Sequence, residues 1–381
     1  MLKFNTGLMR IGFDAKRAFY NNSGLGNYSR DTILSLHHYF PEHDYFLYTP
    51  NKRNPISFLP GGKNIHIVKP TGFNKLSQSY WRSISLGKQL HKDKLDIYHG
   101  LSNELPANII QAEIKKVVSI HDLIFLRYPE LYNSVDRDIY QQKFFEASLA
   151  ADKIIAMSHQ TKEDLISFFH TRADDIEVIH QGCNPIFYDK VPPQKRANIL
   201  KKYNLPDTYI LSVGTLEKRK NALKILEGLT ANKIDYPLVF VGKPTTYYKD
   251  IYHYVKHHGM ENRVYFLHDI PNGDLPAIYQ AASVFIYPSI FEGFGIPILE
   301  AMNSGTPVIT NKYGCFVEAG GDAAIYINPN YSEEIGEAVN QVLNDKQKSR
   351  EMTEKGYKQV EKFRQDIITA KLMDLYKSLL Q

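Results

Sequence analysis

A chain of 381 residues with 43% hydrophobic and 12% aromatic side chains has enough apolar material for two packed domains. We expect no membrane-spanning helix, because no run of about 18 apolar residues occurs, and no secretion signal, because no apolar segment of signal-peptide length follows the start. The net charge is only +5, and the two cysteines, Cys183 and Cys315, lack disulfide or metal spacing, which favours a reducing cytoplasm.

In the first half of the chain, short β-rich runs alternate with segments of helical length. We predict strands at residues 10–16, 45–50, 64–70, 95–100, 115–122, 153–158 and 176–182. We predict helices between several of them, at residues 26–40, 73–92, 134–152 and 160–170. This alternation is typical of βαβ units and predicts a mostly parallel sheet that helices cover on both faces.

A polar, proline-bearing connection with a short helix, at residues 184–208, leads to a second α/β half. There we predict strands at 209–215, 236–243, 263–269, 284–289, 306–311 and 323–329. The predicted helices lie at 221–232, 248–259, 275–282, 297–304 and 332–345. The pattern predicts an N-terminal domain of residues 1–186 and a C-terminal domain of residues 187–365.

The last helical run, Lys348 to Leu380, is long for one helix. Gly356 and the residues 363–365 indicate a break. After that break we expect residues 366–381 to pack back on the N-terminal domain.

The stretch from Pro288 to Thr310 is the most informative part of the chain. It carries Glu292 and Glu300 around a Phe-Gly pair, between a predicted strand and a predicted helix. Pro297 suits the first turn of that helix, and a glycine ends it. Glu292 should therefore lie in the loop at the carboxyl end of a strand and Glu300 on the following helix, which is where open α/β sheets bind ligands.

Two acids at that place can accept hydrogen bonds from vicinal hydroxyl groups. Gly293 and Gly295 let the backbone approach a ligand, and amides near a helix N-terminus favour an anion. The alternative interpretation makes Glu292 a loop acid and Glu300 a solvent-facing helix acid.

Three further motifs follow predicted strands. In SGLGNY, Gly24 and Gly26 would let backbone amides reach a phosphate or sugar, although the spacing is not that of a dinucleotide fingerprint. His121 ends a strand and can face a ligand, with Asp122 or a backbone carbonyl setting its tautomer; otherwise it only caps the strand. In GTLEKRKN, three cations at residues 218–220 precede a helix, where they oppose its dipole unless an anion such as a diphosphate shares the site; the alternative is a solvated basic turn.

We expect no metal site. The acids of the DxD-like string, Asp136 and Asp138, open a predicted helix, where carboxylates suit the dipole. No other cluster has the spacing of metal ligands.

Residues 45–92 contain eight lysines or arginines and no acid, and residues 73–92 mix these cations with aromatics that include Trp81. Such a segment can lie on an anionic membrane with the tryptophan as its anchor. The alternative is an ordinary surface helix whose aromatics belong to the core. Nucleic-acid binding is disfavoured because no fold motif for it occurs.

Taken in order, these motifs resemble those of the retaining glycosyltransferases of family 4, which have the GT-B fold. The resemblance covers nearly the whole chain and rests on SGLGNY, SIHDLIFLRYPELY, MSHQTKEDL, VIHQGCNPIFY, VGTLEKRKN, LHDIPNGDLPAIYQAASVFIYPSIFEGFGIPILEAMNSGTPVIT and GGDAAIYINP. The HDLIF-RYPE and GTLE-RKN variants look most like the mannosyltransferase-type branch. The resemblance implies two Rossmann-like α/β domains whose parallel sheets face each other across a cleft, with the C-terminal helix returning to the N-terminal domain.

The resemblance also implies residue roles. The implied catalytic residues are His121, Glu292, Arg219 and Lys220. The implied donor site comprises Gly24, Gly26, Thr215, Arg219, Lys220, His268, Asp269, Ile270, Glu292, Gly293, Phe294, Gly295 and Glu300.

Within that site, Glu292 would bind the sugar hydroxyls and Glu300 the ribose. Arg219 and Lys220 would neutralise the diphosphate, residues 268–270 would meet the base, and the amides of residues 293–295 would face the sugar and diphosphate. Many members carry Arg where this chain has Thr215, so Arg219 would have to supply that charge.

The implied activity is metal-independent transfer of a hexose, with retention, from a nucleotide-diphosphate sugar to a glycan or lipid-linked acceptor in polysaccharide synthesis. Mannose from GDP-mannose is the leading candidate, and no cofactor besides the donor is implied. The protein would be cytoplasmic, with a peripheral site at the inner membrane face if residues 45–92 bind lipid. A noncatalytic GT-B-like subunit that binds a nucleotide or glycan, and an isomerase similar to nucleotide-sugar 2-epimerases, are the alternatives.

Overall fold

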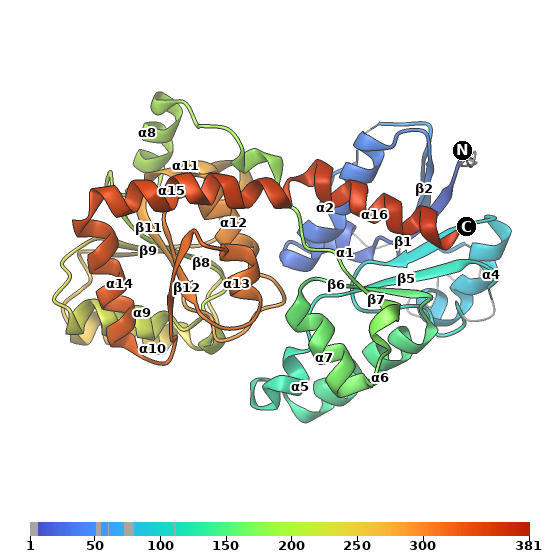
Figure 1. Ribbon diagram of the computed structural model, residues 1–381, viewed down its shortest axis with the longest axis horizontal. Coiled ribbons are helices and arrows are strands. Elements are labelled where there is room, and N and C mark those ends of the chain that lie inside the picture. Colours follow the sequence, from blue (N-terminus) through green and yellow to red (C-terminus); the bar gives the residue numbers. More distant parts are fainter. Residues whose placement is uncertain (1–6, 51–54, 60, 72–79, 110–111) are drawn as a thin grey trace. The chain divides into compact units, whose positions relative to one another are not determined.

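The computed structural model describes residues 7–50, 55–59, 61–71, 80–109 and 112–381. The chain forms two compact units (Figure 1). One consists of residues 1–181 and 365–381, and the other of residues 182–364. The predicted boundaries lay at 186/187 and 365/366. The junction lies before residue 186 because the Cys183 amide donates to the Phe363 carbonyl at 3.1 Å. This hydrogen bond makes the start of the connecting segment part of the second unit.

The first unit contains a seven-stranded sheet of order β3-β2-β1-β4-β5-β6-β7, in which every pair is parallel. Its strands are β1 (Arg10–Asp14), β2 (Asp44–Tyr48), β3 (Ile65–Val68), β4 (Ile97–Gly100), β5 (Lys115–Ile120), β6 (Lys153–Ala156) and β7 (Ile176–Val178). Its α-helices are α1 (Lys16–Tyr20), α2 (Gly24–Tyr39), α4 (Leu86–Lys92), α5 (Ile124–Arg127), α6 (Ser134–Ala150), α7 (His159–Phe169) and α16 (Gln365–Leu379). A π-helical turn, η2 (Trp81–Ser85), leads into α4, and two 3₁₀ turns are η4 (Pro129–Leu131) and η5 (Ala173–Asp175).

The second unit contains a six-stranded parallel sheet of order β10-β9-β8-β11-β12-β13. Its strands are β8 (Tyr209–Val213), β9 (Leu238–Val241), β10 (Val264–Leu267), β11 (Ala282–Tyr287), β12 (Val308–Asn311) and β13 (Ala324–Ile327). Its α-helices are α8 (Pro193–Lys202), α9 (Ala222–Ala231), α10 (Tyr248–His257), α11 (Leu275–Ala281), α12 (Ile296–Asn303), α13 (Cys315–Gly320), α14 (Ser332–Asn344) and α15 (Lys346–Val360). Four 3₁₀ turns are η6 (Pro185–Phe187), η7 (Lys218–Lys220), η8 (Asn272–Asp274) and η9 (Glu361–Phe363).

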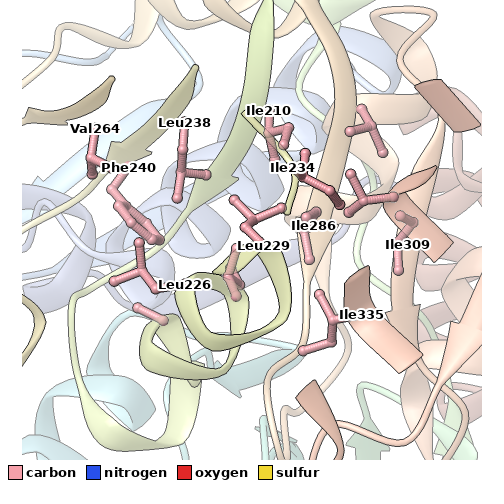
Figure 2. Packing of buried hydrophobic residues seen from close by; sticks show 14 of the residues in the cluster. Ile210, Leu226, Leu229, Ile234, Leu238, Phe240, Val264, Ile286, Ile309 and Ile335 are labelled. Atoms are coloured by element: carbon pink, nitrogen blue, oxygen red, sulfur yellow. The ribbon is translucent and has the colours of Figure 1, made fainter. Parts of the chain in front are cut away.

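The core of the second unit follows from the period-two alternation of its buried strands. On one face, side chains from the sheet meet α9 and α14; Figure 2 shows Ile210, Leu226, Leu229, Leu238, Phe240, Ile286, Ile309 and Ile335 among them. Phe285, which alternates with Ile286 on β11, faces the other side and lies 5.4 Å from the ring of Tyr279 on α11. The predicted parallel sheet with helices on both faces is thereby confirmed for this unit.

The end of the chain confirms the predicted return to the first unit. The helical run breaks at Arg364, between η9 and α16, whereas Gly356 lies inside α15. Gly356 is therefore not the break; a side chain there would come within 3.3 Å of Met302, so the glycine permits close packing of α15 on α12. Helix α16 packs against α2, and its Tyr376 is completely buried.

Three short helices, α1, α5 and α13, were not predicted from the sequence. The first strand stops at Asp14, and residues 16–20 form α1 instead of continuing it. Helix α13 follows Gly314, whose φ of +60° only glycine adopts readily. All three helices, of four to six residues, are too short to show a 3.6-residue hydrophobic period.

Candidate functional site

All six strands of the second sheet are parallel, so their carboxyl ends meet at one edge. The loops at that edge hold the predicted residues of this unit, since residues 214–221 follow β8, 268–270 follow β10 and 288–295 follow β11. The predicted helix after the last of these loops is confirmed as α12, with Pro297 in its first turn and a left-handed Gly305 (φ +79°) just after its end. Glu292 lies in the loop and Glu300 on the helix, as expected from the sequence.

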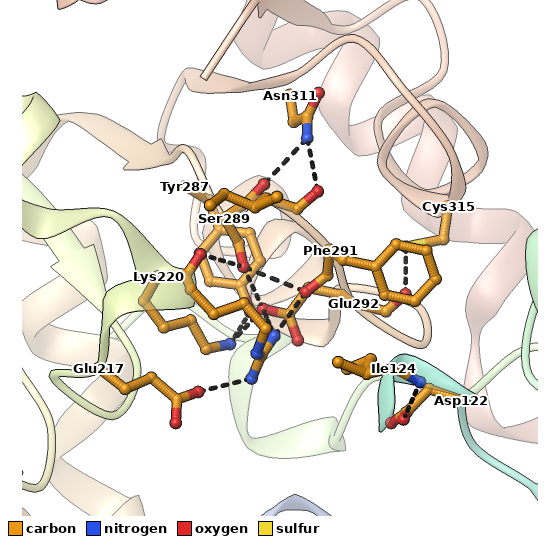
Figure 3. A network of polar contacts seen from close by, with 12 residues as sticks. Asp122, Ile124, Glu217, Lys220, Tyr287, Ser289, Phe291, Glu292, Asn311 and Cys315 are labelled. Carbon is orange, nitrogen blue, oxygen red and sulfur yellow. Dashed lines mark hydrogen bonds and ion pairs between the residues drawn. The ribbon is translucent and has the colours of Figure 1, made fainter. Parts of the chain in front are cut away.

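The carboxylate of Glu292 is the centre of a nearly buried ion cluster (Figure 3). One of its oxygens lies 2.5 Å from Lys220 Nζ and 2.6 Å from an Arg219 guanidinium nitrogen. The same oxygen accepts a hydrogen bond from Ser289 Oγ at 2.6 Å. Lys220 also donates to the Tyr287 hydroxyl at 2.6 Å. The two predicted groups, carboxylate and cations, therefore form one structural unit.

Backbone contacts fix the two loops that supply this cluster. The Ile290 amide donates to the Arg219 carbonyl at 2.9 Å, and the Arg219 guanidinium donates to the Phe291 carbonyl at 2.5 Å. The side-chain amide of Asn311, at the end of β12, donates from Nδ2 to the backbone carbonyls of Ser289 and Ile290 at 3.0 and 3.2 Å. These bonds hold the charged side chains in position before any ligand arrives.

The charges of the cluster balance within the chain. Glu217 lies 2.6 Å from the second side of the Arg219 guanidinium, so two carboxylates face two cations. Burial alone would raise the pKa of Glu292, but Arg219 and Lys220 outweigh it and hold that pKa at about 2. Burial opposes the charge of Arg219 as well, yet Glu292 and Glu217 keep its pKa above the ordinary value.

The cations do not occupy the first turn of α9. They form the separate turn η7, and Asn221, with a left-handed φ of 65°, divides that turn from the helix. The expectation that three cations crowd the helix start is therefore corrected. An anion does share the site with these cations, namely the Glu292 carboxylate of the same unit.

Glu300 has a second, separate partner. Its carboxylate accepts a hydrogen bond at 2.7 Å from the hydroxyl of Tyr279, which is completely buried on α11. This bond orients the acid on α12, about one helical turn from the start of the helix and the loop that holds Glu292.

The residues between the two acids shape the backbone. The Phe294 side chain is buried against Phe363, with ring centroids 5.3 Å apart, so only the backbone of Phe294 can face a ligand. Gly295 precedes α12 with φ +110°, a value that a side chain would strain. Gly293 is partly exposed in the same loop.

The remaining predicted donor residues lie at the ends of β8 and β10. Thr215 follows Gly214, whose carbonyl would lie 1.9 Å from any side chain at Gly242, so the loops after β8 and β9 approach closely. His268 donates from Nδ1 to the Gly242 carbonyl at 2.6 Å. Asp269 is exposed with a left-handed φ of 54°, and Ile270 is partly exposed beside it.

In the first unit, His121 is 5% exposed at the end of β5. Its Nε2–H donates to the Leu101 carbonyl at 2.9 Å, and Nδ1 accepts from the Gln181 amide at 3.2 Å. Of the two expected partners that could set the His121 tautomer, the backbone carbonyl of Leu101 does so. The Asp122 carboxylate accepts a hydrogen bond from the Ile124 amide instead (Figure 3). Burial lowers the pKa of His121 to about 4, so the ring is neutral near pH 7.

Gly24 and Gly26 lie in the first turn of α2 and not in a loop ahead of it. A side chain at Gly24 would meet nothing within 4 Å, whereas one at Gly26 would lie 1.8 Å from the Asn21 carbonyl. The Gly26 amide donates to the Ser23 carbonyl at 2.9 Å. Gly26 is thus required for packing, and Gly24 is the open position of the pair.

Three members of the Glu292 cluster were not singled out from the sequence: Glu217, Tyr287 and Ser289. Tyr287 ends β11 and Ser289 stands three residues before Glu292, so their place at a strand's carboxyl end was the available signal. Nothing local marks Glu217 as a partner of Arg219 rather than of solvent.

The acids considered for a metal lie at a helix start. Asp136 is in the first turn of α6, where its amide donates to the side chain of the cap residue Asn133 at 2.8 Å. Among residues 7–50, 55–59, 61–71, 80–109 and 112–381, no group of three or more His, Cys, Asp or Glu side chains could hold a metal ion.

The predicted membrane anchor is part of the core. Trp81 is 3% exposed and packs with Leu86 and Leu90. Arg82 donates inward, to Asp14 and to Glu104, at 2.9 Å each. For Trp81 the structure therefore supports the alternative interpretation, a side chain that belongs to the core, whereas the neighbouring Tyr80 is 51% exposed.

Exposed lysines remain in the basic stretch, namely Lys63, Lys69, Lys88 and Lys92. Residues 72–79, with Lys75, lie outside the described residues. Contact with an anionic membrane stays a proposal that rests on these lysines. No helix within the described part of the chain is long and apolar enough to cross a membrane.

Each of the two α/β units matches a known protein family. The family model described as Glycosyltransferase Family 4 matches residues 23–186, and the model described as Glycosyl transferases group 1 matches residues 195–359. The O-antigen chain mannosyltransferase B of Escherichia coli is 32% identical over 289 residues, which cover 74% of each chain. The chain belongs to glycosyltransferase family 4.

Another relative of this glycosyltransferase is the O-antigen chain mannosyltransferase RfbU of Salmonella typhimurium, which is 27% identical over 60% of each chain. Among solved structures, a sucrose-phosphate synthase from Thermosynechococcus elongatus superposes with a TM-score of 0.80 at 20% identity, covering 98% of this chain and 99% of that one. HepE of Anabaena, solved in complex with UDP, gives a TM-score of 0.75 at 18% identity over 97% of this chain and 100% of its own. These neighbours confirm the predicted GT-B fold.

Proposed function

We propose that the protein transfers mannose, with retention, from GDP-mannose to a glycan or lipid-linked acceptor in polysaccharide synthesis. The mannosyltransferase names of its O-antigen relatives support the sugar and the pathway. The observation that carries the proposal is the Glu292 cluster, because it joins a hydroxyl-binding carboxylate to two cations suited to a diphosphate.

Donor binding would exchange the partners of this cluster. A diphosphate carries more negative charge than one carboxylate, so it can compete with Glu292 for Arg219 and Lys220. The released carboxylate would then accept hydrogen bonds from the sugar hydroxyls. We propose that Glu300 binds the ribose, that residues 268–270 meet the base, and that Gly293 and Gly295 present backbone amides.

The reaction that we propose depends on orienting the substrates and stabilising charge in the transition state more than on a reactive side chain. His121 has both ring nitrogens engaged within the chain and a pKa of about 4, which disfavours it as a general base at neutral pH. We assign it contact with the transferred sugar through the ring edge. Arg219 and Lys220 would stabilise the leaving diphosphate, the task that a metal ion performs in other transferases.

The test is a screen of nucleotide sugars for donor-dependent nucleotide release and product formation. We expect GDP-mannose with a mannose-terminated glycan to give product, the new linkage to keep the donor's anomeric configuration by NMR, and a chelator to leave the rate unchanged. If no nucleotide sugar shifts the melting temperature or releases nucleotide, donor use is contradicted. Inversion of the configuration or loss of the rate with chelator would contradict those parts of the proposal.

The same screen separates the two alternatives. A rearranged nucleotide sugar formed without any acceptor would favour an isomerase. Binding without turnover in every donor and acceptor pair would favour a binding subunit.

A further inference from the structure

A buried chain of hydrogen bonds crosses the first unit from its last helix to its second. The Tyr376 hydroxyl on α16 lies 2.6 Å from His99 Nδ1 on β4. His99 Nε2 lies 2.8 Å from Ser119 Oγ on β5, and that oxygen lies 2.8 Å from the Tyr28 hydroxyl on α2. Tyr376 and His99 are 277 residues apart in the sequence, so tertiary packing alone assembles the chain.

The polar groups of this chain lie in the core. Tyr376, His99 and Ser119 are completely buried, and Tyr28 is partly exposed at the other end. A buried polar group without a partner is costly, so Tyr376, His99 and Ser119 depend on one another, while the Tyr28 hydroxyl also bonds the Thr32 side chain. Burial, together with the neighbouring His121, lowers the pKa of His99 to about 3, which keeps the imidazole neutral.

The proton positions follow from counting donors. A neutral imidazole has one N–H, and the Tyr376 hydroxyl has no other hydrogen-bond partner within the part of the chain that the structure describes. Its proton is satisfied only if it donates to His99 Nδ1. His99 then carries its proton on Nε2 and donates to Ser119, which pairs in turn with the Tyr28 hydroxyl.

The chain ends against His121. The Tyr28 ring meets the His121 ring edge to face, with centroids 4.7 Å apart and the planes at 90°. Leu101 and Gln181 hold the nitrogens of His121, and Tyr28 limits the tilt of the ring. The orientation of His121 therefore depends on where the Tyr28 hydroxyl is held.

We propose that Tyr376, His99 and Ser119 are positioning residues, which act through Tyr28 to orient the ring of His121. The C-terminal helix thereby supports a site residue that Tyr376 does not touch. The inference rests on the proposed contact between His121 and the transferred sugar. The hydrogen-bond chain itself moves no proton during transfer.

Tyr376→Phe tests the proposal, because it removes the hydroxyl and keeps the ring. We expect kcat to fall by roughly three- to tenfold, the effect of one misplaced contact, with the donor KM within about twofold. In ¹⁵N-histidine NMR spectra, we expect His99 to lose its fixed Nε2–H tautomer and the His121 signals to shift. Tyr45→Phe is the matched control, since Tyr45 is equally buried in the same unit and its hydroxyl donates to the backbone carbonyls of Leu36 and Phe40; its kcat and its His99 and His121 signals should match those of the wild type.

A folded Tyr376→Phe protein with unchanged kcat, or with unchanged His121 signals, would overturn the proposal. An Nδ1–H tautomer of His99 in the wild type would do the same. Should Tyr376→Phe fail to fold, Ser119→Ala breaks the chain at its middle and is judged by the same two measurements. Because the spectra need no turnover, a protein that transfers no sugar would refute the proposed function while the histidine readout still decides whether the chain orients His121.

Discussion

Glu292 is the residue on which the second unit's site depends. It is nearly buried, and it is the carboxylate shared by Arg219 and Lys220, with Glu217 completing the balance. Under the proposed function, a group so placed would serve both folding and donor binding. Replacing Glu292 should therefore change both the free energy of unfolding and the rate of transfer.

We expect Glu292→Gln to lower the free energy of unfolding by about 3–5 kcal/mol, because it leaves two cations side by side in a nearly buried site. We expect transfer to fall about 100-fold or more, since the sugar loses its carboxylate partner. GDP should bind roughly 5- to 10-fold more tightly, because Glu292 no longer competes for the cations.

Urea unfolding, steady-state kinetics and calorimetric titration with GDP measure these three effects. The double variant Glu292→Gln/Lys220→Met is the control, since it removes the uncompensated charge and should regain stability without regaining transfer. Weaker GDP binding by Glu292→Gln would contradict the exchange of partners that we propose.

Acidification provides a second prediction for single residues. His99 and His121 have folded-state pKa values of about 3 and about 4, below the ordinary 6.5, so the unfolded chain binds more protons as the pH falls below 6.5. Stability should then fall with pH by about 1.4 kcal/mol per unit for each histidine. Glu292, with a pKa of about 2, adds a further loss as the pH falls from 4.5 towards 2.

Urea denaturation between pH 7.5 and 4 measures this slope. Tyr376→Phe should leave the slope from His121 in place. A flat stability curve over this interval would show that the histidines titrate normally in the folded protein.

At the scale of the elements, the informative segments are those between strands and helices. The loops after β8 and β11 are joined by hydrogen bonds to backbone carbonyls and supply the charged groups of the cluster. In the basic stretch before β4, by contrast, Trp81 and Arg82 point inward. Sequence patterns showed where these segments begin and end but not which side chains face inward.

The first turn of α2 offers a matched pair of substitutions. We expect Gly26→Ala to destabilise the protein by about 1–3 kcal/mol, because its methyl group would lie 1.8 Å from the Asn21 carbonyl. Gly24→Ala has open space and should change stability by less than about 1 kcal/mol.

If Gly24 lies against the donor, as the family resemblance implies, Gly24→Ala should raise the donor KM at unchanged stability. Thermal unfolding and steady-state kinetics of both variants check this. A Gly24→Ala enzyme with wild-type KM would remove Gly24 from the donor site.

At the scale of the whole molecule, the chain passes between the units twice, after Gln181 and after Arg364. The second passage brings α16 to the first unit, where it covers α2 and supplies Tyr376. The second unit, by contrast, is built from one continuous segment, residues 182–364.

This arrangement predicts unequal effects of a truncation. Removing residues 365–381 should destabilise the first unit and abolish transfer, because the loss of α16 exposes a face that it buries in the intact protein. GDP binding by the second unit should persist. Removing only residues 380–381 is the control and should change neither property. Calorimetry with and without GDP follows the two units, and full transfer by the longer truncation would contradict the prediction.

The amino-acid sequence was enough to predict the alternation of strands and helices, the two parallel sheets, the helix after Glu292 and the break before the last helix. These features are local, since hydrophobic period, proline and glycine act within one element. It also marked Glu292, Glu300, Arg219, Lys220 and His121 as candidates, because residues at the carboxyl ends of parallel strands share an edge.

Tertiary packing sets how these residues pair. It made Glu292 the counter-ion of Arg219 and Lys220, placed Trp81 in the core and joined Tyr376 to His99 across 277 residues. The reason is that hydrogen bonds and ion pairs act over a few ångströms between groups that any length of chain can separate. Periodicity shows which face of an element is buried, but the partner on the other side is set by the packing of the whole unit.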